Sequence, residues 1–165
     1  MLTYIATEVR SVLRTPNTNR GPMPVYQVTT GTDLLSDEQR QQIVGEITRI
    51  HTSHTGAPEL FVNVVFMEVP AGRIFTAGEP SQMSFIVGHI RDGREIEVRQ
   101  AMLRELSAMW AQITGRGDRD LLLALQENDS RAAMEAGLIF PAAGAEEEWF
   151  AENKDKLVEL GLIAA

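Results

Sequence analysis

The sequence predicts an α/β fold in which two consecutive β-α-β units form a four-stranded sheet with both helices on one face. Three observations indicate this fold. Short apolar or β-branched runs alternate with longer segments of helical periodicity, glycine and proline clusters separate them, and the whole order repeats about 60 residues later. The length of 165 residues suits one such domain.

The first unit begins at Pro24. Residues 25–29 are β-branched and alternating, which predicts a strand. Ser36 and Gln39 have the spacing of a capping box, and isoleucines at helical spacing follow, so a helix is expected from about Asp37 to about His54. The nearly continuous apolar run over 60–69 predicts a central strand that is buried on both faces.

A loop rich in glycine and proline over 70–81 separates the first unit from the second. The second unit is expected to contain a strand over 84–90, a tight turn over 91–94, a helix over 96–113 and a second buried strand over 121–125. Both helices on one face would leave an apolar sheet face uncovered, so we expect a symmetric oligomer to cover it.

The C-terminal region predicts further helices. Asp129 or Ser130 can cap a short helix that ends near Gly137. The tail is acidic at first and then offers a last helix with leucines at helical spacing, Leu157, Leu160 and Leu162.

The composition excludes several classes of function. A formal net charge of −8 argues against nucleic acid or an anionic membrane as a partner, and no run of 18 apolar residues predicts a membrane span. The lack of cysteine excludes disulfides and thiolate chemistry and fits a reducing, cytoplasmic location. His51 and His54 lie three residues apart with no carboxylate at ligand spacing, so no metal site is expected.

Two arginines stand where a buried strand leads into a helix. Arg91 and Arg94 flank a glycine turn, so their guanidinium groups and the helix N-terminal amides can converge on one anion. Spacing alone favours the plainer interpretation of two solvated turn arginines. Taken singly, Glu135 is a surface carboxylate, and His51 is a histidine favoured by the dipole at a helix C-terminus.

A set of motifs in one order makes a more specific signal than any of these residues alone. The motifs extend from Pro24 to about Asn153 and are Pro24-Val25-Tyr26, His51, Pro70-Ala71-Gly72, His89-x-Arg91-Asp92-Gly93-Arg94, Glu135-x-Gly137 with Pro141, and Glu148-Trp149-Phe150. Together they resemble the tautomerase superfamily, and within it the cis-3-chloroacrylic acid dehalogenase group. The resemblance implies a cofactor-independent homotrimer whose subunits contain two β-α-β units and act on a small carboxylate.

The resemblance also implies a chemistry. In this family the opening proline is N-terminal after methionine removal, and its secondary amine is the catalytic group. An α-amine titrates at about 7.7–8.0, and neighbouring arginine cations favour its neutral, basic form. Carried over, Pro24 is the base of a keto–enol tautomerase of small 2-oxo or enol carboxylates. Arg91, Arg94 and His51 bind the carboxylate, His51 assists catalysis, and Glu135 is a secondary acid or base that activates water.

Two departures from the family pattern leave alternatives open. The dehalogenase group pairs its glutamate with a tyrosine eleven residues earlier, where this chain has Ala124, so hydration of a cis-3-haloacrylate is the alternative activity. Residues 1–23 precede the domain over 24–165 and make the Pro24 nitrogen an amide. We expect them to be an extension or an unused upstream start, because a start at Met23 would regenerate the amine. A chain that keeps them would be a non-catalytic relative that binds an anion or a partner.

Overall fold

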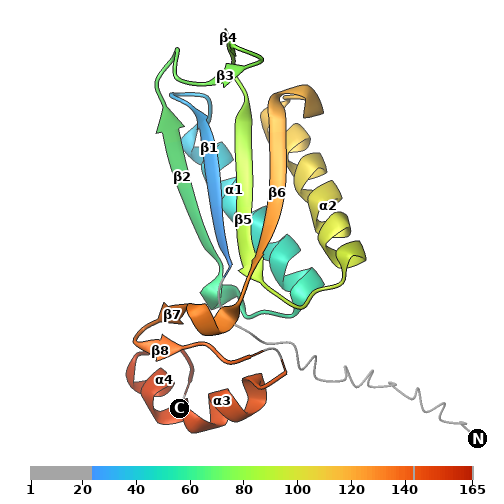
Figure 1. Ribbon diagram of the computed structural model, residues 1–165. Coiled ribbons are helices and arrows are strands. Elements are labelled where there is room, and N and C mark those ends of the chain that lie inside the picture. The colour runs from blue at the N-terminus through green and yellow to red at the C-terminus, as the bar shows by residue number, and fades with distance from the viewer. Residues whose placement is uncertain (1–23, 143, 165) are drawn as a thin grey trace, which may run out of the picture.

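A four-stranded sheet with two long helices on one face dominates the computed structural model, which describes residues 24–142 and 144–164 (Figure 1). The strand order is β2-β1-β5-β6, in which β1 is parallel to β2, β5 is parallel to β6, and β1 and β5 are antiparallel at the centre. This topology confirms the two predicted β-α-β units. The strands are β1 (Val25–Gly31), β2 (Asn63–Val69), β5 (Ser84–Arg91) and β6 (Leu121–Asn128).

The two helices begin and end where the sequence predicts. In α1 (Asp37–Thr55), the Ser36 side chain accepts a hydrogen bond from the Gln39 backbone amide, and the Gln39 side chain accepts one from Ser36, so the capping box is formed. In α2 (Ile96–Thr114), as in α1, a glycine in the left-handed conformation follows the last turn. The isoleucine spacing therefore located α1 correctly.

The core lies between the helices and one face of the sheet. Alternate residues of β1 and β5 point toward the helices and are buried, as the pleat of a strand requires. The fully buried hydrophobic side chains of this layer are Tyr26, Val28, Ile43, Ile47, Ile50, Ile86, Ile90, Met102, Leu106 and Trp110. Each such side chain stabilises the fold by roughly 1.5–3 kcal/mol relative to an exposed position.

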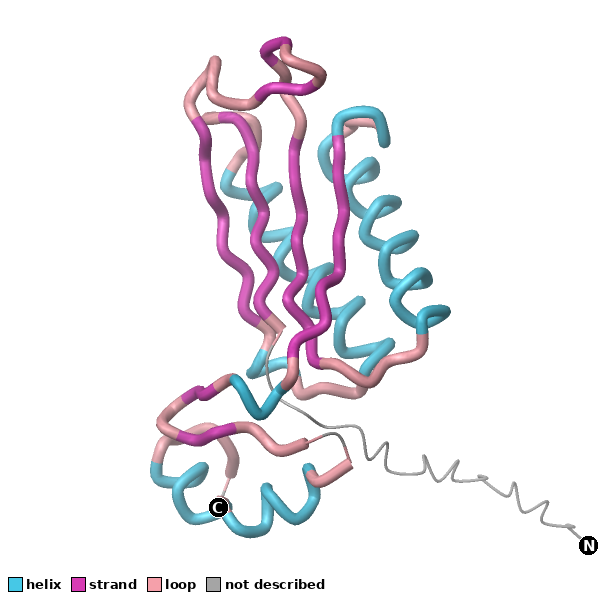
Figure 2. Tube along the Cα trace, viewed as in Figure 1, coloured by secondary structure: helices cyan, strands magenta, loops and turns pink. Residues whose placement is uncertain are grey.

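The expectation of central strands buried on both faces was wrong. The apolar run over 60–69 starts as a 3-10 turn, Glu59–Phe61, and continues as β2, which is an edge strand, as is β6. Val65 and Met67 are 48% and 46% exposed, because both helices cover the opposite face (Figure 2). The edge strands therefore have apolar side chains on both faces of the sheet. The face opposite the helices is not covered within the subunit.

Two short hairpins follow the two β-α-β units. The predicted loop over 70–81 contains β3 (Phe75–Thr76) and β4 (Glu79–Pro80). The prediction of a short helix that ends near Gly137 was wrong. The chain forms only one 3-10 turn there, Ser130–Ala132, which the Asp129 side chain caps. The chain then forms β7 (Met134–Glu135) and β8 (Leu138–Ile139). Ala136 and Gly137 between them have φ values of 52° and 76°, which suit a hairpin turn and not a helix.

The C-terminal segment folds against the end of the sheet where β1 begins and β5 ends (Figure 1). It contains two short helices, α3 (Glu146–Glu152) and α4 (Lys154–Glu159), in place of the single last helix expected. Trp149 packs on Phe140 and Leu157, and its indole N–H donates to the Ile139 carbonyl at 2.8 Å. None of the helices in the described ranges is long and apolar enough to cross a membrane.

Gly88 provides the first testable prediction. It lies opposite Tyr26 in the β1–β5 ladder, and a Cβ at this position would approach Tyr26 Cε1 to 2.6 Å and Leu125 Cδ2 to 2.7 Å. Gly88→Ala should lower the free energy of unfolding by about 1–3 kcal/mol through overpacking. Urea denaturation measures the change.

Gly45→Ala is the matched control. Gly45 lies within α1, and no described atom lies within 4 Å of a Cβ added there, so alanine should raise the free energy of unfolding by about 0.5–1 kcal/mol. Equal effects of the two substitutions would contradict the close packing of Tyr26 on Gly88.

Candidate functional site

Most of the predicted site residues gather at the end of the sheet where β1 begins. Val25 is paired with His89, so the antiparallel register, continued by one residue, sets Pro24 opposite Ile90 and beside Arg91. Pro24 is buried, and its carbonyl accepts a hydrogen bond from the Asn63 amide at 3.0 Å. The backbone pairing of β1 thus brings Pro24 close to the residues that end β5.

Arg91 is a buried cation. Its side chain is 3% exposed and forms an ion pair with Glu146, the first residue of α3, whose side chain is 2% exposed. Glu146 also accepts a hydrogen bond from the Gly144 amide at 3.1 Å. Within the described ranges, the guanidinium nitrogens of Arg91 make no hydrogen bond of good geometry. The site therefore contains buried donors that an anion can satisfy.

Arg94 is half-buried and lies three residues after Arg91. Burial and the positive charge of Arg91 lower its pKa, while Tyr26, Glu127 and Glu146 act in the opposite direction. Its backbone amide donates to Glu127 Oε1 at 3.1 Å, and the other oxygen of Glu127 pairs with Arg99 at 3.1 Å. Arg91 is thus buried and Arg94 half-buried, so neither is a fully solvated turn residue, and their convergence on one anion stays a prediction.

His51 is neutral and hydrogen bonded. The Tyr26 hydroxyl and His51 Nδ1 are 2.9 Å apart, and both side chains are fully buried. Burial lowers the pKa of His51 to about 3, with a further contribution from the Arg94 charge. Burial raises the pKa of Tyr26, so the phenol stays protonated and can donate to Nδ1. His51 then presents an Nε2–H donor, not a positive charge, to a ligand.

Glu135 and Ala124 lie on other elements. Glu135 is half-buried in β7, on the hairpin after β6, and it is not among the groups that shift the Arg94 pKa. Ala124 lies within β6, paired with Val87. The structure thus brings Pro24, His51 and the two arginines to one end of the sheet and places Glu135 on a separate hairpin.

Two residues of this site escaped the sequence analysis as functional residues. Tyr26 had a usable signal, because it lies two residues after Pro24 and strand alternation puts both on one face. Glu146 had none, since an acidic residue at the start of a tail helix is ordinarily solvated. Only the folded C-terminal segment reveals its pairing with Arg91.

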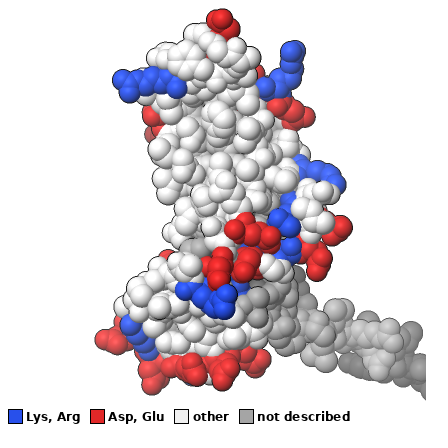
Figure 3. All heavy atoms as spheres, viewed as in Figure 1, with Lys and Arg blue, Asp and Glu red and all other residues white. Residues whose placement is uncertain are grey.

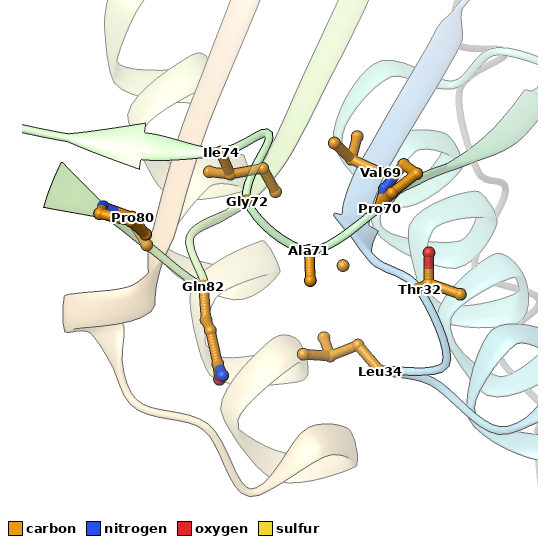
Figure 4. Close-up of a pocket in the computed structure, with 11 residues that line it drawn as sticks. Thr32, Leu34, Val69, Pro70, Ala71, Gly72, Ile74, Pro80 and Gln82 are labelled. Carbon is orange, nitrogen blue, oxygen red and sulfur yellow. The ribbon is translucent and has the colours of Figure 1, made fainter. Parts of the chain in front are cut away.

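A separate hollow of about 420 Å³ lies at the opposite end of the sheet (Figure 4). Its lining comes from the ends of β1 and β2 and from the loop over 70–82, with the side chains of Leu34, Ala71 and Gln82 around it. No lining residue is titratable, so the hollow lacks the groups that acid–base chemistry needs. Across the described ranges, no three His, Cys, Asp or Glu side chains are grouped to hold a metal ion.

The buried His51 predicts a pH dependence of stability. Between pH 6.5 and about 3, the unfolded chain binds a proton at His51 that the folded chain does not, so the free energy of unfolding falls as the pH is lowered through this window. The slope is up to about 1.4 kcal/mol per pH unit. In urea denaturation at pH 7 and pH 5, His51→Gln should lose about 2 kcal/mol less between the two pH values than the native chain. Identical pH dependence in both proteins would contradict a neutral His51.

Comparison with known proteins identifies the family of the chain. Residues 23–154 match the family model described as "Putative oxalocrotonate tautomerase enzyme". The crystal structure of native Ps01740 is 37% identical, with a TM-score of 0.66 over 67% of this chain and 99% of that chain. The structure of N1, a member of the cis-3-chloroacrylic acid dehalogenase family, is 26% identical, with a TM-score of 0.76 over 84% of this chain and 99% of that chain.

More distant structures share the fold. Native fused 4-OT is 20% identical, with a TM-score of 0.63 over 70% of this chain and 94% of that chain. A search of curated proteins found no match. The family match covers most of the sequence and includes every residue of the candidate site. The chain therefore belongs to the tautomerase superfamily, in the group related to cis-3-chloroacrylic acid dehalogenase.

Proposed function

We propose that this protein is a cofactor-independent keto–enol tautomerase of small 2-oxo or enol carboxylates. One observation carries the proposal: Arg91, which ends β5, and Arg94, three residues later, have buried guanidinium nitrogens without a hydrogen-bond acceptor in the described ranges, and the register sets the end of β5 beside Pro24. A substrate carboxylate held there would present its α-carbonyl and the adjacent C–H to the start of β1. Membership of the superfamily supports a tautomerase or dehalogenase type of activity.

In the proposed reaction, Pro24 removes a proton from one atom of the substrate and returns it to another. The neutral secondary amine of Pro24 removes a proton from the carbon next to the carbonyl, and the released electron pair forms the carbon–carbon double bond of an enolate. The prolinium then gives its proton to the enolate oxygen, which yields the enol and restores the neutral amine. Arg94 holds the carboxylate, with Arg91 beside it in its pair with Glu146, and the positive charges of both arginines lower the pKa of the amine. The neutral His51 donates a hydrogen bond to the substrate, and Glu135 acts as a secondary acid or base.

This chemistry requires a free Pro24 amine. Met23 directly precedes Pro24, so a mature chain that starts at Pro24 arises when translation begins at Met23 and the methionine is removed. The family match starts at residue 23, which supports this boundary. Residues 1–23 themselves lie outside the described residues.

Hydration of a cis-3-haloacrylate is the second candidate activity. The similarity to N1, a member of the dehalogenase family, favours it. The small side chain of Ala124, where that group has a tyrosine, leaves Glu135 without its partner for water activation. Release of halide and malonate semialdehyde would distinguish this reaction from tautomerisation. Binding of carboxylates without any turnover would instead favour the non-catalytic alternative.

We also propose that the protein assembles as a homotrimer. Fused 4-OT is described as a trimer, and it shares this fold. The sheet face opposite the helices is largely free of charged side chains (Figure 3). Val65, Met67 and Leu122 expose 45–48% of their surface there, which is typical of a face that another subunit covers.

The chain that starts at Pro24 should be the active form. It should catalyse deuterium exchange at C3 of 2-oxobutanoate in D₂O, followed by proton NMR, whereas the chain that starts at Met1 should not, because its Pro24 nitrogen is an amide.

Arg94→Met should lose about 2–4 kcal/mol of transition-state binding, seen in kcat/KM. Arg73→Met, in an exposed loop, is the control.

Equal exchange rates for the two forms would exclude Pro24 as the base. The intact mass of untagged protein expressed from its own upstream DNA shows which form the cell makes.

Arg94 is a cleaner test than Arg91, because removal of Arg91 leaves Glu146 buried without its partner and destabilises the fold.

Leu122→Arg should prevent assembly. A charge in the centre of an apolar interface must be desolvated, which costs several kcal/mol and should shift the trimer to monomer in light scattering after gel filtration. Val44→Arg, on the outer surface of α1, should leave the mass unchanged. A trimeric Leu122→Arg variant would show that this sheet face is not the interface.

A further inference from the structure

We propose that Glu146 is a specificity residue, which neutralises Arg91 so that the site keeps one uncompensated positive charge and selects ligands with one carboxylate over ligands with two. The inference rests on the proposed function, because it takes Arg94 as the group that meets the substrate carboxylate. It adds a role for a residue of the C-terminal segment, 55 positions along the chain from Arg91.

The charges around Arg94 support this assignment. The acids whose charges reach Arg94 are Glu127 and Glu146. Glu127 is paired with Arg99 at 3.1 Å, and Glu146 is paired with Arg91. His51 is neutral. Among the described residues, Arg94 is therefore left as the cation of this group without an ion-pair partner, and its buried Nε has no hydrogen-bond acceptor.

Glu146 is placed to act on a ligand as well as on Arg91. Its side chain is 2% exposed, so water screens its charge poorly. Its second oxygen, Oε2, is buried and has no hydrogen-bond partner within the described ranges. The charge of Glu146 is therefore matched by Arg91 alone.

A ligand with one carboxylate completes the balance of charge. It pairs with Arg94 and leaves no net charge buried, which is the least costly state for a site with little water. A ligand with two carboxylates brings a second negative charge for which the site has no free cation, because Arg91 is already paired with Glu146. Desolvation of that unpaired charge should lower the affinity by about tenfold or more.

Binding measurements on the full chain test the proposal without requiring catalysis. The probes are 2-oxobutanoate, with one carboxylate, and 2-oxoglutarate, with two, titrated by calorimetry at pH 7.5 and low salt. The readout is the ratio of the two dissociation constants. Glu146→Gln should shift this ratio toward 2-oxoglutarate by about tenfold or more. Glu147→Gln, the exposed next residue of α3, should leave it unchanged. An unchanged ratio in Glu146→Gln would overturn the proposal.

A double variant covers the case in which Glu146→Gln does not fold. Arg91→Met/Glu146→Met removes both charges of the buried pair together, so no unpaired charge remains and the ratio should stay native. A thermal unfolding transition confirms that the variant is folded. A ratio shifted toward 2-oxoglutarate in the double variant would contradict the compensation of Arg91 by Glu146.

Arg94→Met separates failure of this inference from failure of the proposed function. If Arg94→Met loses both probes while Glu146→Gln keeps the native ratio, the carboxylate site stands and only the role of Glu146 is wrong. If Arg94→Met binds both probes as the native chain does, the carboxylate site itself is wrong, and both proposals fall together.

Discussion

The antiparallel pairing of β1 with β5 is the constraint on which the candidate site depends. Within each β-α-β unit the strands are parallel, so their starts lie at one end and their finishes at the other. The central antiparallel ladder reverses one unit against the other and sets the start of β1 beside the finish of β5. Pro24 and Arg91 become neighbours for this reason alone. The same ladder places Tyr26 against Gly88, whose missing side chain leaves room for the phenol that meets His51.

Electrostatics then links the C-terminal segment to this end of the sheet. A buried guanidinium costs several kcal/mol in lost hydration unless a partner is buried with it. Glu146 is that partner for Arg91, and it is held by the first turn of α3 while Trp149 anchors the same helix on Phe140 and Leu157. The tail is therefore part of the charged cluster rather than an appendage. A neutral His51 keeps a third positive charge out of the cluster.

Local signals in the sequence predicted the elements well, and long-range contacts were harder to predict. The Ser36–Gln39 capping box and the isoleucine spacing located α1, because a helix depends on neighbours within one or two turns. The apolar run over 60–69 suggested a central strand, but strand order depends on which unit pairs with which, and β2 became an edge. The turn at Ala136 and Gly137 overrode the helical pattern near Glu135. Arg91 and Arg94 were found from one glycine turn, whereas Glu146 belongs to the site only through tertiary folding.

The repetition of the β-α-β unit also gives the molecule an approximate two-fold axis, so the hollow at the far end of the sheet is the geometric counterpart of the charged end. Each chemical group has been replaced there. The buried face of β5 has Ser84, Ile86 and Ile90 and no phenol like that of Tyr26, and Trp110 has the position relative to its capping glycine that His51 has in α1. Thr32 and Leu35 have the positions relative to the start of α1 that Arg91 and Arg94 have relative to the start of α2. One fold thus offers two related ends, and within the described ranges the buried Arg91–Glu146 pair lies at one of them while the hollow at the other is lined by no titratable residue.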